Sequence, residues 1–267
     1  MTPLPRHWLK PKAKPERGSA VTGMGAGDVA LHHAGAGGRC LLVADHASNA
    51  VPEMLDLGVA PDIMNEHIAV DIGVAALVER MRALLGVPSW TARWSRLVCD
   101  TNRPPAIDMV APPVSDGVGI PGNQGLSSAQ AQLRLDMHAA FHDGLSQLTE
   151  AAQPRLLVSV HSFTPALKSA GQARPWPVAI LWNRDDRGAA LALAALAEEE
   201  GLGGPVGVNE PYSGQILNYT MDRHAEARGL PYVGFEVRQD GLLDAAGLDR
   251  WAGILSHVVA RILERLP

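Results

Sequence analysis

The chain has 267 residues, a length that suits one α/β domain and is short for two full domains. Hydrophobic residues make up 46% of it and charged residues 19%, a balance that excludes a largely disordered chain. The net charge of −5 argues against a nucleic-acid binder that relies on positive charge, and two cysteines cannot form a disulfide framework.

Residues 1–38 are rich in proline, glycine, lysine and arginine and show no sustained hydrophobic period. We therefore expect an N-terminal extension that drapes over the surface or is partly disordered, followed by a single α/β domain over residues 39–267. The extension lacks the apolar stretch of a secretory signal, and no apolar run approaches the roughly 20 residues needed to cross a bilayer. These features predict a cytoplasmic protein that contacts neither membranes nor nucleic acid.

From Cys40 onward, apolar runs alternate with helical patterns. Strands are expected, in chain order, at 40–44, 89–99 (as one strand or two short ones), 156–160, 178–182 and 232–237. Helices are expected at 73–85, from the Ser127–Gln130 capping box to about 151, and at 188–200, 218–228 and 248–266. Such alternation predicts a three-layer α/β/α architecture, with helices on both faces of a mostly parallel central sheet.

Two histidines lie at the carboxyl ends of predicted strands. His46 follows the strand at 40–44, and His161 follows the strand at 156–160. Ligands of open parallel sheets bind beyond the carboxyl ends of the strands, and neutral imidazole nitrogens are preferred ligands of divalent zinc. Both histidines are therefore candidate metal ligands, and hydrogen bonding within their own loops is the alternative.

Two further residues could complete a metal site. Asn49 stands three residues after His46, where many zinc hydrolases carry a glutamate, and its amide oxygen could bind a metal. Asp71 precedes a predicted helix and is the nearest candidate carboxylate. It could ligate the metal or cap the N-terminus of the helix.

Arginines near strand ends are candidates for binding a carboxylate. Arg103 follows Asn102, and a guanidinium with a neighbouring amide can hold a carboxylate, whereas a structural pair of Arg103 with Asp100 is the alternative. Arg238 and Arg184 lie at other strand ends and could bind a second carboxylate.

Glu236 lies inside an apolar strand, where a carboxylate is costly to bury unless it is paired or functional. Burial would raise its pKa toward the range that suits a general base. A salt bridge to Arg238 is the alternative.

Several of these motifs together resemble the N-formylglutamate amidohydrolase family, in order over roughly residues 40–265. The matching segments are Asp-His-Ala-Ser-Asn (45–49), His-Ile-Ala-Val-Asp-Ile-Gly (67–73), Ser-Arg-Leu-Val-Cys-Asp-Thr-Asn-Arg-Pro (95–104), Ile-Pro-Gly-Asn-Gln-Gly-Leu-Ser (120–127), Phe-His (141–142), Val-Ser-Val-His-Ser-Phe-Thr-Pro (158–165) and Gly-Leu-Pro-Tyr-Val-Gly-Phe-Glu-Val-Arg-Gln-Asp (229–240). The resemblance implies a zinc-exopeptidase-like (phosphorylase/hydrolase-like) α/β/α fold.

By this resemblance, and by analogy with carboxypeptidases and aspartoacylases, His46 and His161 would bind zinc or another divalent transition metal. Asn102 and Arg103 would grip a substrate carboxylate, and Glu236 would be the catalytic glutamate. The implied reaction is hydrolysis of N-formyl-L-glutamate, or of a similar small acidic N-formyl or N-acyl amino acid, as in histidine degradation. A deacylase for another N-acyl amino acid and a metal-free binding protein for acidic metabolites are the alternatives.

Overall fold

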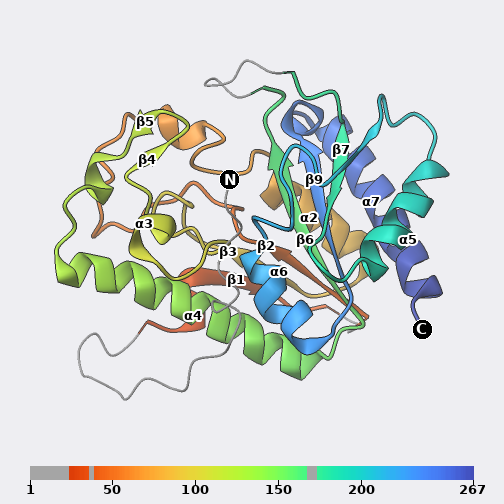
Figure 1. Cartoon of the computed structure of the whole chain (residues 1–267), viewed down its shortest axis with the longest axis horizontal. Helices are drawn as coiled ribbons and strands as arrows, with labels where there is room; N and C mark the ends of the chain where they lie inside the picture. Colours follow the sequence, from red (N-terminus) through yellow and green to blue (C-terminus); the bar gives the residue numbers. More distant parts are fainter. Residues whose placement is uncertain (1–23, 36–38, 167–172) are drawn as a thin grey trace.

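A mixed sheet of seven strands runs through the computed structural model, which describes residues 24–35, 39–166 and 173–267 (Figure 1). Across the sheet the strand order is β1-β3-β2-β6-β9-β7-β8. The strands are β1 (Ala30–His33), β2 (Cys40–Ala44), β3 (Ser89–Ala92), β6 (Leu156–Phe163), β7 (Val178–Leu181), β8 (Val206–Val208) and β9 (Tyr232–Arg238). Four neighbouring pairs are parallel, whereas β1 with β3 and β7 with β9 are antiparallel.

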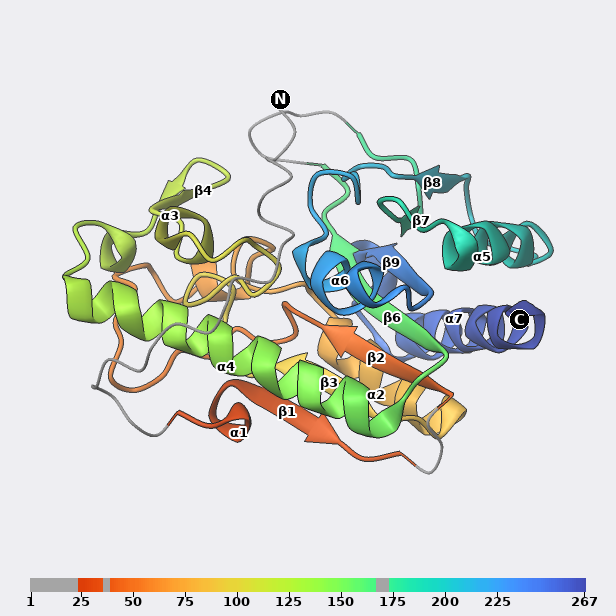
Figure 2. The same ribbon diagram turned by 60° about the horizontal axis from the view of Figure 1, so that its bottom comes forward.

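Helices cover both faces of this sheet (Figure 2). One face carries α2 (Val74–Leu85), α5 (Arg187–Ala197) and α7 (Ala245–Arg265). The other carries the long α4 (Ser128–Ala152) and the short α6 (Tyr219–His224). The expected three-layer α/β/α architecture with a mostly parallel sheet is therefore confirmed.

Side chains of the central strands alternate between the two layers of the core. Leu42 of β2 and Val158 of β6 pack toward α2 and α7, whereas Leu41 and Leu157 pack toward α4. Both faces of these strands are buried, which explains why they read as continuous apolar runs in the sequence.

Short elements complete the described part of the chain. They include α1 (Ala26–Val29), α3 (Ile107–Val110), the hairpin of β4 (Val114–Ser115) and β5 (Val118–Gly119), and the 3₁₀ turns Ile63–Asn65, Pro121–Asn123, Glu226–Arg228 and Gln239–Leu242. None of the helices that the structure describes is both long and apolar enough to cross a membrane.

The N-terminal residues contribute to the sheet. Residues 30–33 form β1, the antiparallel edge strand beside β3, although they fall within the stretch expected to be an extension. Only Ala30 of this strand is buried, so the sequence carries no alternating pattern that would predict it. Residues 1–23 and 36–38 of the expected extension lie outside the described residues.

Most of the predicted elements are confirmed within a few residues. The capping box of α4 is present, because Ser127 Oγ accepts a hydrogen bond from Gln130 N at 3.3 Å and Gln130 Oε1 accepts one from Ser127 N at 2.9 Å. The strand expected over 89–99 is wrong beyond Ala92. Residues 96–98 form a turn, in which Val98 N donates to Ser95 O at 2.8 Å.

Two further expectations need correction. His161 does not follow β6 but lies within it, because the strand continues to Phe163. Asp71 does not cap α2. Gly73 occupies the N-cap position with a φ of +83°, and no side chain caps the helix there.

We predict that Gly73→Ala lowers the free energy of unfolding by about 1–3 kcal/mol. The left-handed backbone strains an L side chain, and a Cβ at this position would lie 2.5 Å from Leu242 Cβ. Gly86→Ala is the matched control, because Gly86 has a φ of +69° but a Cβ there meets nothing within 4 Å. Denaturant unfolding should give a clearly smaller loss for the control, and equal losses would contradict the role of the Leu242 contact.

Candidate functional site

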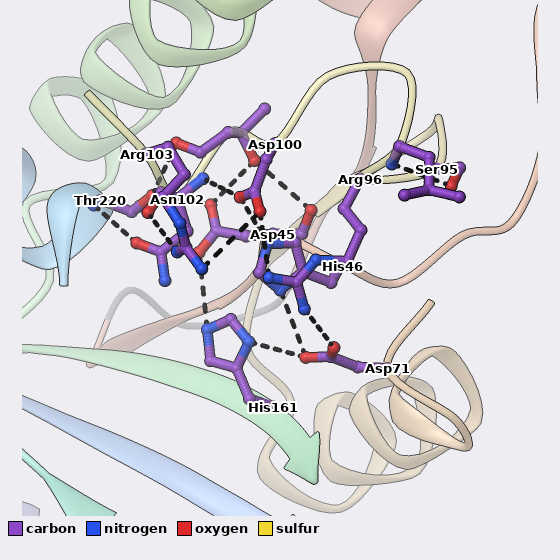
Figure 3. Close-up of polar contacts among 12 residues, drawn as sticks. Asp45, His46, Asp71, Ser95, Arg96, Asp100, Asn102, Arg103, His161 and Thr220 are labelled. Carbon is purple, nitrogen blue, oxygen red and sulfur yellow. Dashed lines mark hydrogen bonds and ion pairs between the residues drawn. The ribbon is translucent and has the colours of Figure 1, made fainter. Parts of the chain in front are cut away.

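Two histidines and an aspartate meet at the carboxyl ends of adjacent parallel strands (Figure 3). His46 comes two residues after β2, His161 lies near the end of β6, and Asp71 lies just before α2. The backbone N–H of Asp71 donates to His46 O at 3.0 Å, which fixes the segment before α2 against the end of β2. All three side chains are buried.

Asp71 lies between the two imidazoles. Its Oδ2 is 2.8 Å from His161 Nδ1 and 3.4 Å from His46 Nδ1. One potential ligand atom from each of the three residues lies within 4.8 Å of the others. The group could therefore hold a metal ion, and it contains three of the four residues expected as ligands.

The opposite nitrogen of each imidazole faces a second buried carboxylate. His46 Nε2 is 2.8 Å from Asp100 Oδ1, and His161 Nε2 is 3.7 Å from Asp45 Oδ2. Carboxylates in this position orient the imidazoles of metal sites and raise their basicity. Asp45 was not singled out from the sequence, and Asp100 was expected only as a partner of Arg103.

The Asp45 carboxylate is itself fixed by hydroxyl groups. Its Oδ1 accepts hydrogen bonds from Thr220 Oγ1 at 2.7 Å and from Thr101 Oγ1 at 3.1 Å. Thr220 lies in α6 and Thr101 in the loop that follows Asp100, so two separate segments hold the carboxylate that faces His161.

Arg96 links two of the aspartates. Its Nη1 donates to Asp71 Oδ1 at 3.2 Å, and its Nη2 donates to Asp100 Oδ2 at 3.0 Å (Figure 3). The planar guanidinium suits this bridging position, where a lysine would provide a single point of charge. Arg96 could not be recognised from the sequence, because residues 89–99 were expected to form a strand and the residue lies in a turn instead.

Asp71 and its histidine neighbours shift one another's pKa values. Burial would raise the pKa of Asp71, but the charge of His46 together with the hydrogen bond and charge of His161 outweighs it and holds that pKa well below its usual range. Burial would lower the pKa of His161, but Asp71 outweighs it and raises that pKa to about 9. In the described part of the chain, the buried His46 Nδ1 finds no hydrogen-bond partner. A divalent metal would satisfy this nitrogen and replace the proton on His161.

Glu236 lies next to His161. The two residues are register partners on the parallel strands β9 and β6. The Glu236 side chain is buried, and its Oε2 has no hydrogen-bond partner among the residues that the structure describes. Burial raises the pKa of Glu236 to about 7, with His161 opposing the shift. The alternative of a salt bridge to Arg238 is wrong, because the Arg238 guanidinium pairs with Asp240 at 2.8 Å.

A cavity of about 160 Å³ opens onto these side chains. Its lining includes His46, Asp71, Arg96, Asn102, Arg103, His161 and Glu236. Arg103 Nη1 donates to Asn102 O at 3.0 Å, and Arg103 Nη2 lies 4.0 Å from Asp100 Oδ2. The long distance to Asp100 leaves the Arg103 guanidinium able to take a substrate carboxylate.

Three expected site residues lie elsewhere. Asn49 is exposed, and its amide donates to Asn65 Oδ1 at 3.1 Å. Arg238 and Arg184 do not line the cavity, and their guanidinium groups pair with Asp240 and Glu226. Each of these side chains is bound locally, so the fold does not bring them to the histidines.

Comparisons with known proteins agree on the family. The model of the N-formylglutamate amidohydrolase family matches residues 38–243. A crystal structure of an Agrobacterium tumefaciens gene product is similar with a TM-score of 0.81 and 30% identity, over 88% of this chain and 95% of that one. The crystal structure of N-formylglutamate amidohydrolase from Ralstonia eutropha gives a TM-score of 0.65 and 19% identity, over 89% and 98%. No curated protein sequence matches the chain.

We predict that His46→Ala, Asp71→Ala and His161→Ala each abolish stoichiometric metal binding. Each change removes one of the three potential ligands, and two ligands rarely retain zinc. The protein should bind about one zinc per chain before the change and well under half an equivalent after it, measured by metal analysis after dialysis. The control is Asn49→Ala, which should keep the metal, and a histidine or Asp71 variant that keeps a full equivalent would remove that residue from the site.

Proposed function

We propose, because this chain belongs to the N-formylglutamate amidohydrolase family, that it hydrolyses N-formyl-L-glutamate or a similar N-formyl or N-acyl amino acid. Family membership makes the chain a hydrolase that acts on amide bonds. One observation carries the finer proposal: the buried Glu236 lies beside the His46–Asp71–His161 group, in a cavity that Arg103 also lines.

His46, Asp71 and His161 are the proposed ligands of zinc or another divalent transition metal. Two imidazoles and one carboxylate form a common three-ligand set of catalytic zinc, which leaves a coordination position open. When bound, the metal supplies a Lewis acid that polarises the acyl carbonyl and acidifies water. Asp100 orients the His46 imidazole by a hydrogen bond, Asp45 faces the His161 imidazole as an ion-pair neighbour, and Arg96 holds the other oxygen of Asp71.

Glu236 is the proposed general base. It accepts the proton of the attacking water and then delivers that proton to the amine nitrogen as the amide bond breaks. A carboxyl group with a pKa of about 7 can do both near neutral pH, because it loses and regains a proton at little cost. Burial of the carboxylate supplies this property, since the apolar neighbours of β9 stabilise its protonated form.

Arg103 and Asn102 are proposed to bind the carboxylate of the amino acid. Asn102 Oδ1 already accepts a hydrogen bond from Thr220 N at 3.1 Å, so the amide nitrogen is the group that can donate to a substrate. Arg96 is committed to Asp71 and Asp100, which makes Arg103 the better partner for an incoming anion. Holding the carboxylate places the scissile amide near Glu236.

An amine-release assay on matched N-formyl and N-acetyl amino acids, with and without chelator, tests the proposed function. We expect release of free amino acid from N-formyl-L-glutamate or from another member of the panel, and its loss when the metal is removed. Activity that survives complete metal removal would overturn the metal-dependent reaction. A protein that binds the acids but releases no amine would be a binding protein for acidic metabolites.

We predict that Glu236→Gln lowers kcat by about 10²–10⁴-fold, the usual contribution of general-base catalysis. Zinc content should stay unchanged, because Glu236 is not among the proposed ligands. The raised pKa of Glu236 means that its ionised form opposes folding once the pH rises above its unfolded value, through about 7. The glutamine variant should therefore unfold at no lower a temperature than the wild type at pH 8. A variant that melts early yet turns over normally would show a structural role instead.

A further inference from the structure

A second group of buried histidines lies outside the cavity. His138 and His142 are one turn apart on α4, and His224 lies on α6. They are 1%, 0% and 0% exposed. The His142 and His224 rings are stacked, with centroids 5.1 Å apart, and the His138 and His142 centroids are 4.4 Å apart. Burial lowers the pKa of His138 to about 4 and of His224 to about 3, so these rings are neutral at physiological pH.

The partners of these rings determine which nitrogen carries the proton. His142 Nε2 is 2.9 Å from Thr101 O, and a carbonyl oxygen can only accept, so this nitrogen donates. The Nδ1 of neutral His142 then accepts from His224 Nε2 at 2.9 Å. His224 Nδ1 is left as an acceptor for Arg228 Nη1, at 3.3 Å. The hydrogen bonds thus run in one direction, from Arg228 to the Thr101 carbonyl.

His138 makes a parallel contact one turn earlier. Its Nε2 donates to Arg103 O at 2.9 Å. The two carbonyls that α4 holds therefore belong to Thr101 and Arg103, on either side of Asn102. Both lie in a stretch without helix or strand, so no regular ladder of backbone hydrogen bonds fixes their position.

This stretch, the 100–103 loop, contributes to the site at every position. Asp100 faces His46, Thr101 holds Asp45, and Arg103 and Asn102 line the cavity. A shift of the loop would move the group that binds the substrate carboxylate and the carboxylates that orient the histidines. An error of about 1 Å in such a group is enough to reduce catalysis strongly.

We propose that His138 and His142 are positioning residues, which hold the 100–103 loop in its working place by donating to its carbonyls from the rigid helix α4. His138 sets the position of Arg103. His142, kept in one tautomer by His224, sets the position of Thr101 and, through Asp100 and Asp45, the orientation of the two histidines at the metal site.

Leucine and glutamine variants separate positioning from packing. Leucine removes the donor, whereas the glutamine amide nitrogen can reach the place of Nε2. The first measurement is steady-state kinetics, and it rests on the proposed function. We expect His138→Leu to raise KM for N-formyl-L-glutamate about tenfold and to change kcat less than about threefold. His138→Gln should restore KM to within about threefold of the wild type.

The second measurement, of zinc affinity in His142 variants, does not require turnover. Chelator competition should show about tenfold weaker zinc binding by His142→Leu, the effect of losing a group that orients metal ligands, and recovery in His142→Gln. If the wild type releases no amine from any member of the panel, the proposed function fails. The zinc affinities of the His142 variants still decide the role of His142. Should a leucine variant not fold, the asparagine variant replaces it, because its shorter amide cannot reach the carbonyl.

Thr149→Val is the matched control on the same helix. Thr149 Oγ1 is buried and donates to Leu145 O at 2.7 Å, away from the 100–103 loop. The control removes a buried side-chain hydrogen bond of α4 without touching the 100–103 loop, and it should leave KM and zinc affinity unchanged. Leucine variants that lose stability but keep KM and zinc affinity would overturn the proposal, and so would glutamine variants that fail to restore KM or zinc affinity.

Discussion

The carboxylate of Asp71 is the contact on which the rest of the site depends. One of its oxygens serves both His46 and His161, and the other accepts a hydrogen bond from Arg96. The sheet makes this possible, since β2 and β6 are parallel neighbours and bring the two histidines to the same edge. The backbone contact of Asp71 with His46, together with the left-handed Gly73, then directs the start of α2 so that the carboxylate lies between the rings.

Burying this many charges is costly unless they compensate one another. Asp45, Asp71 and Asp100 are 0–4% exposed, and they are balanced by Arg96, by the hydroxyl groups of threonines and by the histidines. The negative charge that remains raises the pKa of His161. The same surplus would stabilise the divalent cation that we propose for this site.

Local patterns in the sequence were enough to predict the central strands, the capped helices and the placement of His46 and Glu236. Asp71 and Asn49 could not be ranked as ligands, because the choice depends on how the chain returns to the end of β2. Arg96 was hidden by the assignment of residues 93–99 to a strand. The contact between His142 and His224 spans 82 residues, and no local period reveals such a pair. Sequence therefore indicates which residue types are available, while the tertiary contacts decide which of them meet.

Two acids that line the same cavity, Asp71 and Glu236, acquire opposite properties from their surroundings. Asp71 faces two imidazoles and a guanidinium, so it stays ionised far below neutral pH and suits a metal. Glu236 lies in an apolar strand with an unpartnered oxygen within the described structure, so its pKa rises to about 7 and it suits proton transfer. Neither property belongs to the carboxyl group itself. Separation of two acid roles by environment is how hydrolases obtain a fixed anion and a mobile proton from the same chemistry. In the proposed mechanism, the segment before α2 supplies the fixed anion and β9 supplies the mobile proton.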